Sequence, residues 1–201
     1  MSFKINTFEK VLCVLMVLVF AWSIGSFAVG CSRVRQDVLR LHVLANSNST
    51  ADQSIKLKVR DRILKESENM LCKMADKQTA ISEINRHLPD LTVAANDELK
   101  KLGSSDTAEV SFEKTYFETR QYEDVTLPAG EYDALRVKIG SAQGKNWWCV
   151  LYPQMCVASA SARDEIDEKL DKDEVDLVTN GEKYRVKFFV IELFERIKEV
   201  F

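Results

Sequence analysis

Histidine, proline and glycine are scarce in this sequence, and the spacings that usually mark metal or phosphate sites are missing. Its 201 residues include 2 His, 3 Pro and 7 Gly. No H-x-x-x-H or C-x-x-C pair is present, so the usual ligand spacing of a zinc site is absent. Neither a glycine-rich phosphate loop nor a G-x-S-x-G nucleophile elbow occurs. The sequence therefore predicts no metal, no cofactor and no catalytic residue.

A surplus of positive charge is also missing. The chain has 28 Lys and Arg residues against 31 Asp and Glu residues, which gives a formal net charge of -3. Domains that bind nucleic acid usually carry a basic surface, so we expect no nucleic-acid partner. Hydrophobic residues make up 46% and charged residues 29%, a balance typical of a folded globular protein, and the length favours one domain.

One long hydrophobic run stands near the N-terminus. Val11–Val29 contains no charged residue, Lys4 and Lys10 precede it, and Arg33 and Arg35 follow it. Its length suits a helix that crosses a bilayer. A basic start followed by an apolar stretch is also typical of a secretory signal peptide. The run therefore predicts export or membrane anchoring, and it leaves open whether the segment is cleaved.

This run divides the chain into three predicted parts. Residues 1–30 are a signal peptide or membrane anchor, residues 31–36 are a tether, and residues 37–201 form the exported domain. If the segment stays uncleaved, residues 11–29 hold the protein in a membrane.

Two of the cysteines form a candidate disulfide. Cys149 and Cys156 lie close in sequence, and Pro153 between them favours a turn that could bring them within bonding distance. Export to an oxidising compartment would permit the bond. Cys31 ends the tetrapeptide "AVGC", which weakly resembles a bacterial lipobox, but Ala28 is a poor match where a larger aliphatic residue is usual. Lipidation of Cys31 is therefore the less favoured outcome.

The hydrophobic periodicity predicts an α+β domain with helices packed on a mostly antiparallel sheet. The expected elements, in chain order, are a strand within 37–47, a helix over 51–75, a second helical region over 78–102 interrupted at Pro89, strands within 108–118, 131–139 and 147–152, and an amphipathic helix at the end. The strands at 131–139 and 147–152 are separated by a short loop with two glycines, so we expect them to form a hairpin.

Two of these strands differ in pattern. In the first, Leu39, Leu41 and Val43 alternate with Arg40 and His42, which predicts a half-buried strand with a polar outer face.

The strand at 147–152 begins with Trp147 and Trp148 and is apolar on both faces. It therefore needs cover on both sides, from helices or from a partner.

Two regions near the C-terminal end carry opposite signals. Residues 163–176 hold eight acids and three bases, which predicts an acidic linker or a solvated helix. In the terminal helix, Val186, Val190, Leu193 and Ile197 recur at spacings of three and four residues. This spacing gives one apolar face, which we expect to pack on the core.

Two pairs of residues are candidates for hydrolytic chemistry. Cys149 and His42 both lie on predicted strands and could form a nucleophile and base. Glu131 and Asp133 stand two apart on a strand and would share a face. Neither pair has flanking residues that mark a catalytic site, so an exported envelope hydrolase is the alternative to a non-enzymatic role. A third hypothesis is a structural, membrane-anchored protein that has no receptor.

Two longer blocks carry a family resemblance. Leu39–Asp61, "LRLHVLANSNSTADQSIKLKVRD", and Leu127–Cys156, "LPAGEYDALRVKIGSAQGKNWWCVLYPQMC", resemble the stage II sporulation protein R family of endospore-forming bacteria. The Ala-Asn-Ser turn, the Pro-Ala-Gly-Glu-Tyr segment and the Asn-Trp-Trp-Cys-Val-Leu run are the most specific matches, and they occur in the family's order.

The resemblance implies a function that composition does not. Such proteins are made in the forespore and exported into the space between the forespore and mother-cell membranes. There they activate a membrane-embedded aspartic protease of the mother cell, which then processes the precursor of an early mother-cell sigma factor. The resemblance implies a signal and not an enzyme. Tryptophan and arginine are frequent anchors of interfaces, and the candidate receptor contacts are Arg40, His42, Asn46, Trp147 and Trp148.

Overall fold

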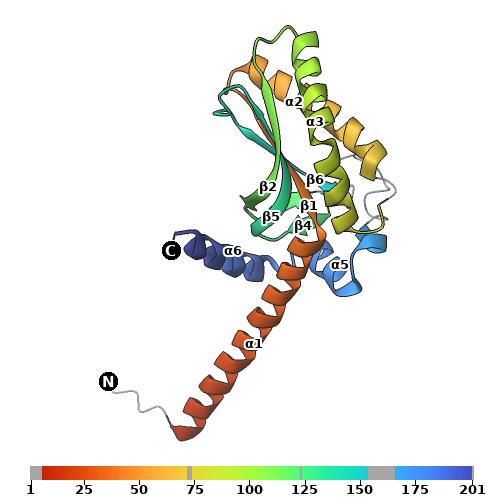
Figure 1. The fold of residues 1–201 in the computed structure, drawn as a ribbon. Helices are drawn as coiled ribbons and strands as arrows, with labels where there is room; N and C mark the ends of the chain where they lie inside the picture. Colours follow the sequence, from red (N-terminus) through yellow and green to blue (C-terminus); the bar gives the residue numbers. More distant parts are fainter. Residues whose placement is uncertain (1–5, 72–73, 123, 154–165, 201) are drawn as a thin grey trace.

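The computed structural model describes residues 6–71, 74–122, 124–153 and 166–200, and its elements form an α+β fold (Figure 1). In chain order they are α1 Thr7–Asp37, β1 Leu39–Leu44, α2 Thr50–Leu71, α3 Lys77–Lys101, β2 Ala108–Phe117, β3 Arg120–Tyr122, β4 Val125–Leu127, β5 Gly130–Ile139, β6 Asn146–Tyr152, α5 Lys172–Thr179 and α6 Arg185–Val200. The predicted fold class is confirmed.

Four strands form the main sheet in the order β2-β5-β1-β6. β1 pairs in parallel with β5 and antiparallel with β6, and β2 pairs antiparallel with β5. The expected hairpin of 131–139 with 147–152 is wrong because β1 lies between these two strands. Residues 140–145 step across the end of β1, where Gly144 donates its N–H to the carbonyl of Ala45 at 2.8 Å.

β1 is buried on both faces, so the expected half-buried strand is wrong. Leu39, Leu41 and Val43 face the core beneath α2 and α3. Arg40 and His42 point the other way, and they are 0% and 6% exposed. A second layer covers part of this face of the sheet. It contains the C-terminal part of α1, the β3–β4 ribbon, α5 and α6.

α2 and α3 cover one face of the sheet side by side (Figure 1). Val59 and Ile63 of α2 and Ile84 and Leu91 of α3 are fully buried in this layer. The expected interruption at Pro89 is wrong, because α3 continues through it. Pro89 lies on the exposed side of the helix, where water can hydrate the carbonyl that loses its hydrogen bond.

α1 runs without a break from the apolar segment into the domain, so the expected tether at 31–36 is wrong. Cys31 and Val34 are fully buried and hold this part of the helix against the second layer. The N-terminal part of α1 projects away from the domain (Figure 1). Because the helix ends at Asp37 and β1 begins at Leu39, the sheet and the projecting helix are directly connected.

The acidic region is folded against the domain where the structure describes it. Residues 163–165 lie outside the described residues, but Ile166, Leu170 and Leu177 are buried in the second layer. Glu174 is also buried, 1% exposed, and its carboxylate accepts the N–H of Asp171 at the start of α5. The expected acidic linker is therefore wrong for residues 166–176. The expected helix is present and most of its acids are exposed, but its apolar side is buried and so it is not fully solvated.

α6 is an amphipathic helix, as expected, but most of its apolar face is not in the core. Phe188 and Ile191 are buried, whereas Val186, Phe189 and Leu193 are exposed. The periodicity predicted the face correctly and its burial wrongly.

Candidate functional site

A buried arginine lies between aromatic rings on the second-layer side of β1. The guanidinium carbon of Arg40 is 3.9 Å from the ring centre of Phe117 and 5.0 Å from that of Tyr132. Its Nη2 donates a hydrogen bond to the hydroxyl of Tyr122. Nε and Nη1 have no hydrogen-bond acceptor within the described part of the chain. Stacking on the rings therefore partly offsets the cost of burying this charge.

Burial shifts the pKa values of both Arg40 and Tyr132. Burial lowers the pKa of Arg40, while the nearby hydroxyls of Tyr122 and Tyr132 oppose that shift. Burial raises the pKa of Tyr132, whose hydroxyl donates to the carbonyl of Pro128 at 2.6 Å. Tyr132 is therefore a neutral donor beside the Arg40 guanidinium.

His42 belongs to the same cluster and is neutral at neutral pH. Its ring centre lies 5.9 Å from that of Phe117 and 6.0 Å from that of Trp148. Burial lowers the pKa of His42 to about 4. Because Arg40 and His42 are both buried, the structure offers neither side chain to a partner at its surface.

The Cys149–His42 pair is not formed. Cys149 lies directly opposite Leu41 and faces the α2–α3 layer, whereas His42 lies opposite Trp148 on the other face of the sheet. Cys149 also takes part in a disulfide. Cys156 lies outside the described residues, so the pairing of Cys149 with Cys156 stays a prediction.

Trp147 and Trp148 lie on opposite faces of β6, and each stacks on an arginine. The guanidinium carbon of Arg60, on α2, is 4.2 Å from the ring centre of Trp147. That of Arg120, on β3, is 3.8 Å from the ring centre of Trp148. Trp147 is 37% exposed and Trp148 is half-buried. β6 is the last strand in the sheet order, so these four residues, here called the tryptophan edge, line one border of the described sheet.

Asn46 has a structural role in the fold. Its side-chain oxygen accepts hydrogen bonds from the N–H of Ser141 at 2.8 Å and from the Ser141 hydroxyl at 2.9 Å. Gly140, at φ +56°, lies against this side chain, and a Cβ there would come within 2.5 Å of the Asn46 oxygen. Asn46 therefore holds the loop that crosses the end of β1.

In the second hydrolase candidate, the pair Glu131 and Asp133, the carboxylate of Asp133 forms ion pairs with two lysines. Lys77 Nζ lies 2.8 Å and Lys114 Nζ 3.4 Å from the carboxylate of Asp133. Burial alone would raise the pKa of Asp133, but these two ion pairs outweigh it and leave that pKa lowered. Glu131 and Asp133 both line a polar hollow of about 610 Å³. A carboxylate neutralised by two lysines is a poor general acid.

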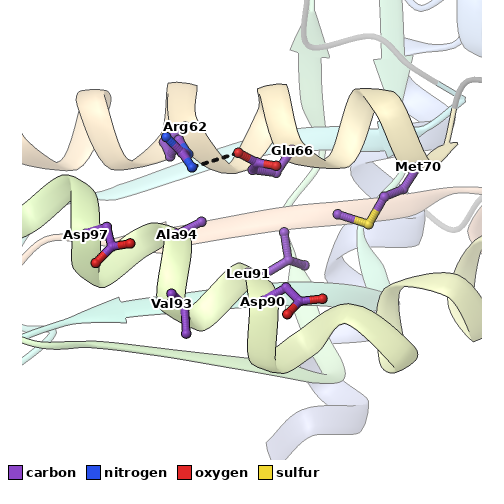
Figure 2. Close-up of a pocket in the computed structure, with 8 residues that line it drawn as sticks. All are labelled: Arg62, Glu66, Met70, Asp90, Leu91, Val93, Ala94 and Asp97. Carbon is purple, nitrogen blue, oxygen red and sulfur yellow. Dashed lines mark ion pairs between the residues drawn. The ribbon is translucent and has the colours of Figure 1, made fainter.

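A smaller hollow of about 210 Å³ lies between α2 and α3 (Figure 2). An ion pair of 2.8 Å joins Arg62 to Glu66 on the α2 side, and Asp90 and Asp97 line the hollow on the α3 side. The remaining lining residues are Met70, Leu91, Val93 and Ala94. The hollow contains no nucleophile paired with a base. In the described ranges, no group of three His, Cys, Asp or Glu side chains could hold a metal ion.

The projecting part of α1 is apolar and uncovered. α1 is the one helix in the described residues that is long and apolar enough to cross a membrane. Phe20 is 59% exposed and Trp22 81% exposed, so this helix is not a core helix of the domain. Its position near the N-terminus fits a signal peptide or an anchor. Cys31, the lipobox candidate, is buried and free.

Sequence reasoning missed the residues that surround the candidate contacts. Arg60, Arg120, Phe117, Tyr122 and Tyr132 come from four different elements. The aromatic and basic content of "YFETRQY", residues 116–122, was the available signal. Its strand β3 has only three residues, too few to show a period.

Comparison with known proteins supports the resemblance. Residues 35–162 match the family model described as stage II sporulation protein R. The chain is 34% identical over 140 residues to the stage II sporulation protein R of Bacillus subtilis strain 168, an alignment that covers 70% of this chain and 62% of that protein. The chain thus spans less than two thirds of the length of this relative. No solved structure matches the chain.

Proposed function

Because the chain belongs to the stage II sporulation protein R family, we propose that it is an exported signalling protein of sporulation. Family membership supports the role in sporulation. The finer proposal is that the domain leaves the forespore and reaches the space between the forespore and mother-cell membranes. There it activates a membrane-embedded aspartic protease of the mother cell, and that protease processes an early mother-cell sigma factor precursor.

The tryptophan edge is the surface that we propose contacts the receptor. Two tryptophans and two arginines, the residue types most frequent among interface hot spots, line one border of the sheet. Trp147 is partly exposed against Arg60, so a partner can reach it without unfolding the domain. Arg40 and His42, which the sequence suggested as contacts, are buried behind this edge, where the His42 ring centre lies 6.0 Å from that of Trp148.

Reconstitution tests both levels of the proposal. The full-length chain, the candidate protease and the sigma factor precursor are brought together in vesicles, and cleavage of the precursor is followed with time. We expect cleavage only when the chain is present. If the precursor is cleaved equally well without it, or never cleaved, the signalling role is wrong.

Matched variants then test the contact surface. Trp147→Ala should reduce cleavage roughly tenfold, as loss of an interface hot spot does. Val93→Ala, at an exposed position on α3, should leave cleavage unchanged. Thermal unfolding of both variants reports whether the fold is intact. A folded Trp147→Ala protein that still triggers cleavage at the normal rate would move the contact elsewhere while leaving the signalling proposal intact.

The hydrolase alternative has no geometric support in the described residues. Cys149 and His42 lie on opposite faces of the sheet, and Asp133 is paired with Lys77 and Lys114. The same purified chain incubated with cell-envelope material provides the direct assay. Release of soluble fragments that depends on the chain would revive the alternative.

A further inference from the structure

α6 presents a broad apolar face to solvent. The exposed fractions lie between 49% and 71% for Val186, Phe189, Leu193, Phe194 and Ile197. Contiguous apolar patches of this kind are uncommon on soluble monomers, and they mark sites that contact proteins or membranes. A second surface must therefore cover this face when the protein acts.

The direction of this face follows from the opposite side of the helix. Phe188 and Ile191 are buried in the second layer, and the Phe188 ring centre lies 5.0 Å from that of Phe27 on α1. With 3.6 residues per turn, Phe188 and Ile191 share one side of α6, and Val186, Leu193 and Ile197 fall on the other. The exposed side chains therefore point away from the domain.

Basic side chains border the apolar face on both sides. At 100° per residue, Lys187 and Lys198 fall along one edge of the face, and Arg185 and Arg196 fall along the other. Two of the four, Arg185 and Lys187, make no ion pair within the described residues. Lys198 pairs with Glu195 at 3.4 Å, and Arg196 pairs with Glu192 at 2.8 Å and with Glu118 at 3.0 Å.

The acids of α6 take a different place. Glu192 and Glu195 lie toward the side that packs on the domain, and Glu195 pairs with Arg35 of α1 at 3.5 Å. α6 therefore has an apolar face bordered by basic residues, with its acids on the opposite side. Helices that lie in a membrane interface have this arrangement, because their cations contact anionic headgroups.

α6 also lies where α1 would leave a membrane. Phe27, which packs on Phe188, follows the exposed Trp22 by roughly 7–8 Å along the helix axis. Tryptophan is enriched at membrane interfaces. α6 begins beside the point at which α1 leaves the domain and extends away from α1 to one side (Figure 1).

We propose that α6 lies on the surface of the bilayer that α1 enters, with its apolar face among the acyl chains and its basic edges against anionic phospholipid headgroups. This contact requires that α1 is still attached to the domain and inserted, and it does not depend on the identity of the receptor. The domain then has two attachments to one membrane, a spanning helix and a surface helix, which together fix its orientation.

Site-specific photocrosslinking in vesicles tests this placement. The full-length chain carries the photoreactive amino acid p-benzoylphenylalanine in place of Phe189 or Leu193, and it is reconstituted into vesicles of phosphatidylcholine and phosphatidylglycerol. The control carries the same probe at Val93, an exposed apolar position on α3. Mass spectrometry identifies the adducts. We expect lipid adducts at 189 and 193, and at 93 only a background yield.

A lipid yield at 189 and 193 no higher than at 93 would overturn the proposal. Crosslinks from these positions to a second copy of the chain, in place of lipid, would overturn it as well and would identify the face as a protein interface.

Charge reversal tests the role of the basic edge. Lys187→Glu combined with Lys198→Glu should lower the lipid adduct yield at 189 severalfold in vesicles with phosphatidylglycerol, and much less in vesicles of phosphatidylcholine alone. Lys100→Glu combined with Lys101→Glu on α3 is the matched control and should have no effect. An equal loss in both lipids, or no loss in either, contradicts the electrostatic part of the proposal. Circular dichroism verifies that each variant is folded.

Discussion

The two faces of the four-stranded sheet are covered by layers of different origin. The α2–α3 layer comes from one continuous stretch of chain, and its contact with the sheet is almost entirely aliphatic. The second layer is assembled from the end of α1, the short β3–β4 ribbon, α5 and α6. Arg40 and His42 of β1 are buried beneath this layer and Glu174 of α5 within it, whereas the buried charges of the α2–α3 layer are Lys56 and Lys77. The first layer has the composition expected of a stabilising core, and the second joins the domain to the projecting helix.

This comparison predicts the largest loss of stability in the α2–α3 layer. Ile63→Ala removes a fully buried side chain and should lower the free energy of unfolding by about 2–5 kcal/mol. Val93→Ala, on the exposed side of the same layer, should change it by less than about 0.5 kcal/mol. Urea unfolding followed by circular dichroism measures both. Equal effects of the two substitutions would mean that this layer is not the stabilising core.

The disulfide of Cys149 connects to the same side of the sheet, and its partner can be identified chemically. We expect Cys156→Ser to break the bond and to cost about 2–3 kcal/mol of stability. Cys72→Ser should leave both the bond and the stability unchanged. Peptide mapping under non-reducing conditions reads out the pairing. A Cys72–Cys149 peptide in the native protein would replace the predicted pairing and would link the chain segment after α2 to the sheet.

Substitutions of Arg40 test how packing and charge contribute to the stability of the second layer. Arg40→Met keeps most of the side-chain volume and removes the buried charge, so the free energy of unfolding should fall by less than about 1.5 kcal/mol, or rise. Arg40→Ala leaves a cavity between Phe117 and Tyr132 and should cost about 2–5 kcal/mol. Chemical unfolding of the two variants separates packing from charge. A large loss in Arg40→Met would show that the charge itself stabilises the layer.

The last prediction is a pH dependence of stability that arises from His42. The pKa of His42 in the folded protein is about 4, below its ordinary value, because burial disfavours the imidazolium. Between pH 6.5 and 4 the unfolded chain binds a proton that the folded chain does not. The free energy of unfolding therefore falls as the pH decreases through this window. His42→Phe should remove about 1–2 kcal/mol of that fall, a figure reduced for partial access of solvent.

His87→Gln is the control for this pH prediction. His87 lies on the surface of α3, where hydrogen bonds to Asp90 and Glu83 raise its pKa. Its titration therefore acts in the opposite direction, and its removal should leave the loss of stability on acidification in place. Unfolding curves collected across the window compare the three proteins. Identical slopes for His42→Phe and the unsubstituted protein would contradict the assignment.

Local pattern predicted the elements well and their neighbours poorly. Alternation located β1, β5 and β6 within a few residues, and the two-faced apolar character of β6 agrees with the burial of Cys149 through Tyr152. Sheet order is a long-range property, so nothing local indicated that β1 lies between β5 and β6.

The errors about burial have the same origin. The polar face of β1 is covered by pieces that come from both ends of the chain, and β3 and β4 are too short to show a period. In α6, amphipathicity reveals an apolar face and says nothing about what covers it. The candidate site was predicted where tryptophans stand next to each other in sequence. Their arginine partners were not predicted because Arg60 and Arg120 reach them only through the tertiary fold.

The position of Phe27 means that removal of residues 1–30 would alter the packing of the domain. The Phe27 ring packs against Tyr184 and Phe188, and it lies within residues 1–30, the predicted signal peptide or anchor. Gly30 also lets α1 approach Leu177 of α5 closely. A cut before Cys31 would take the ring out and leave a vacancy beneath the first turns of α6. The cleaved and uncleaved proteins would then differ in how tightly α6 packs on the domain. Proteolysis would therefore change the structure of the domain as well as its freedom to diffuse. Melting curves of the chain with and without residues 1–30 would measure that difference.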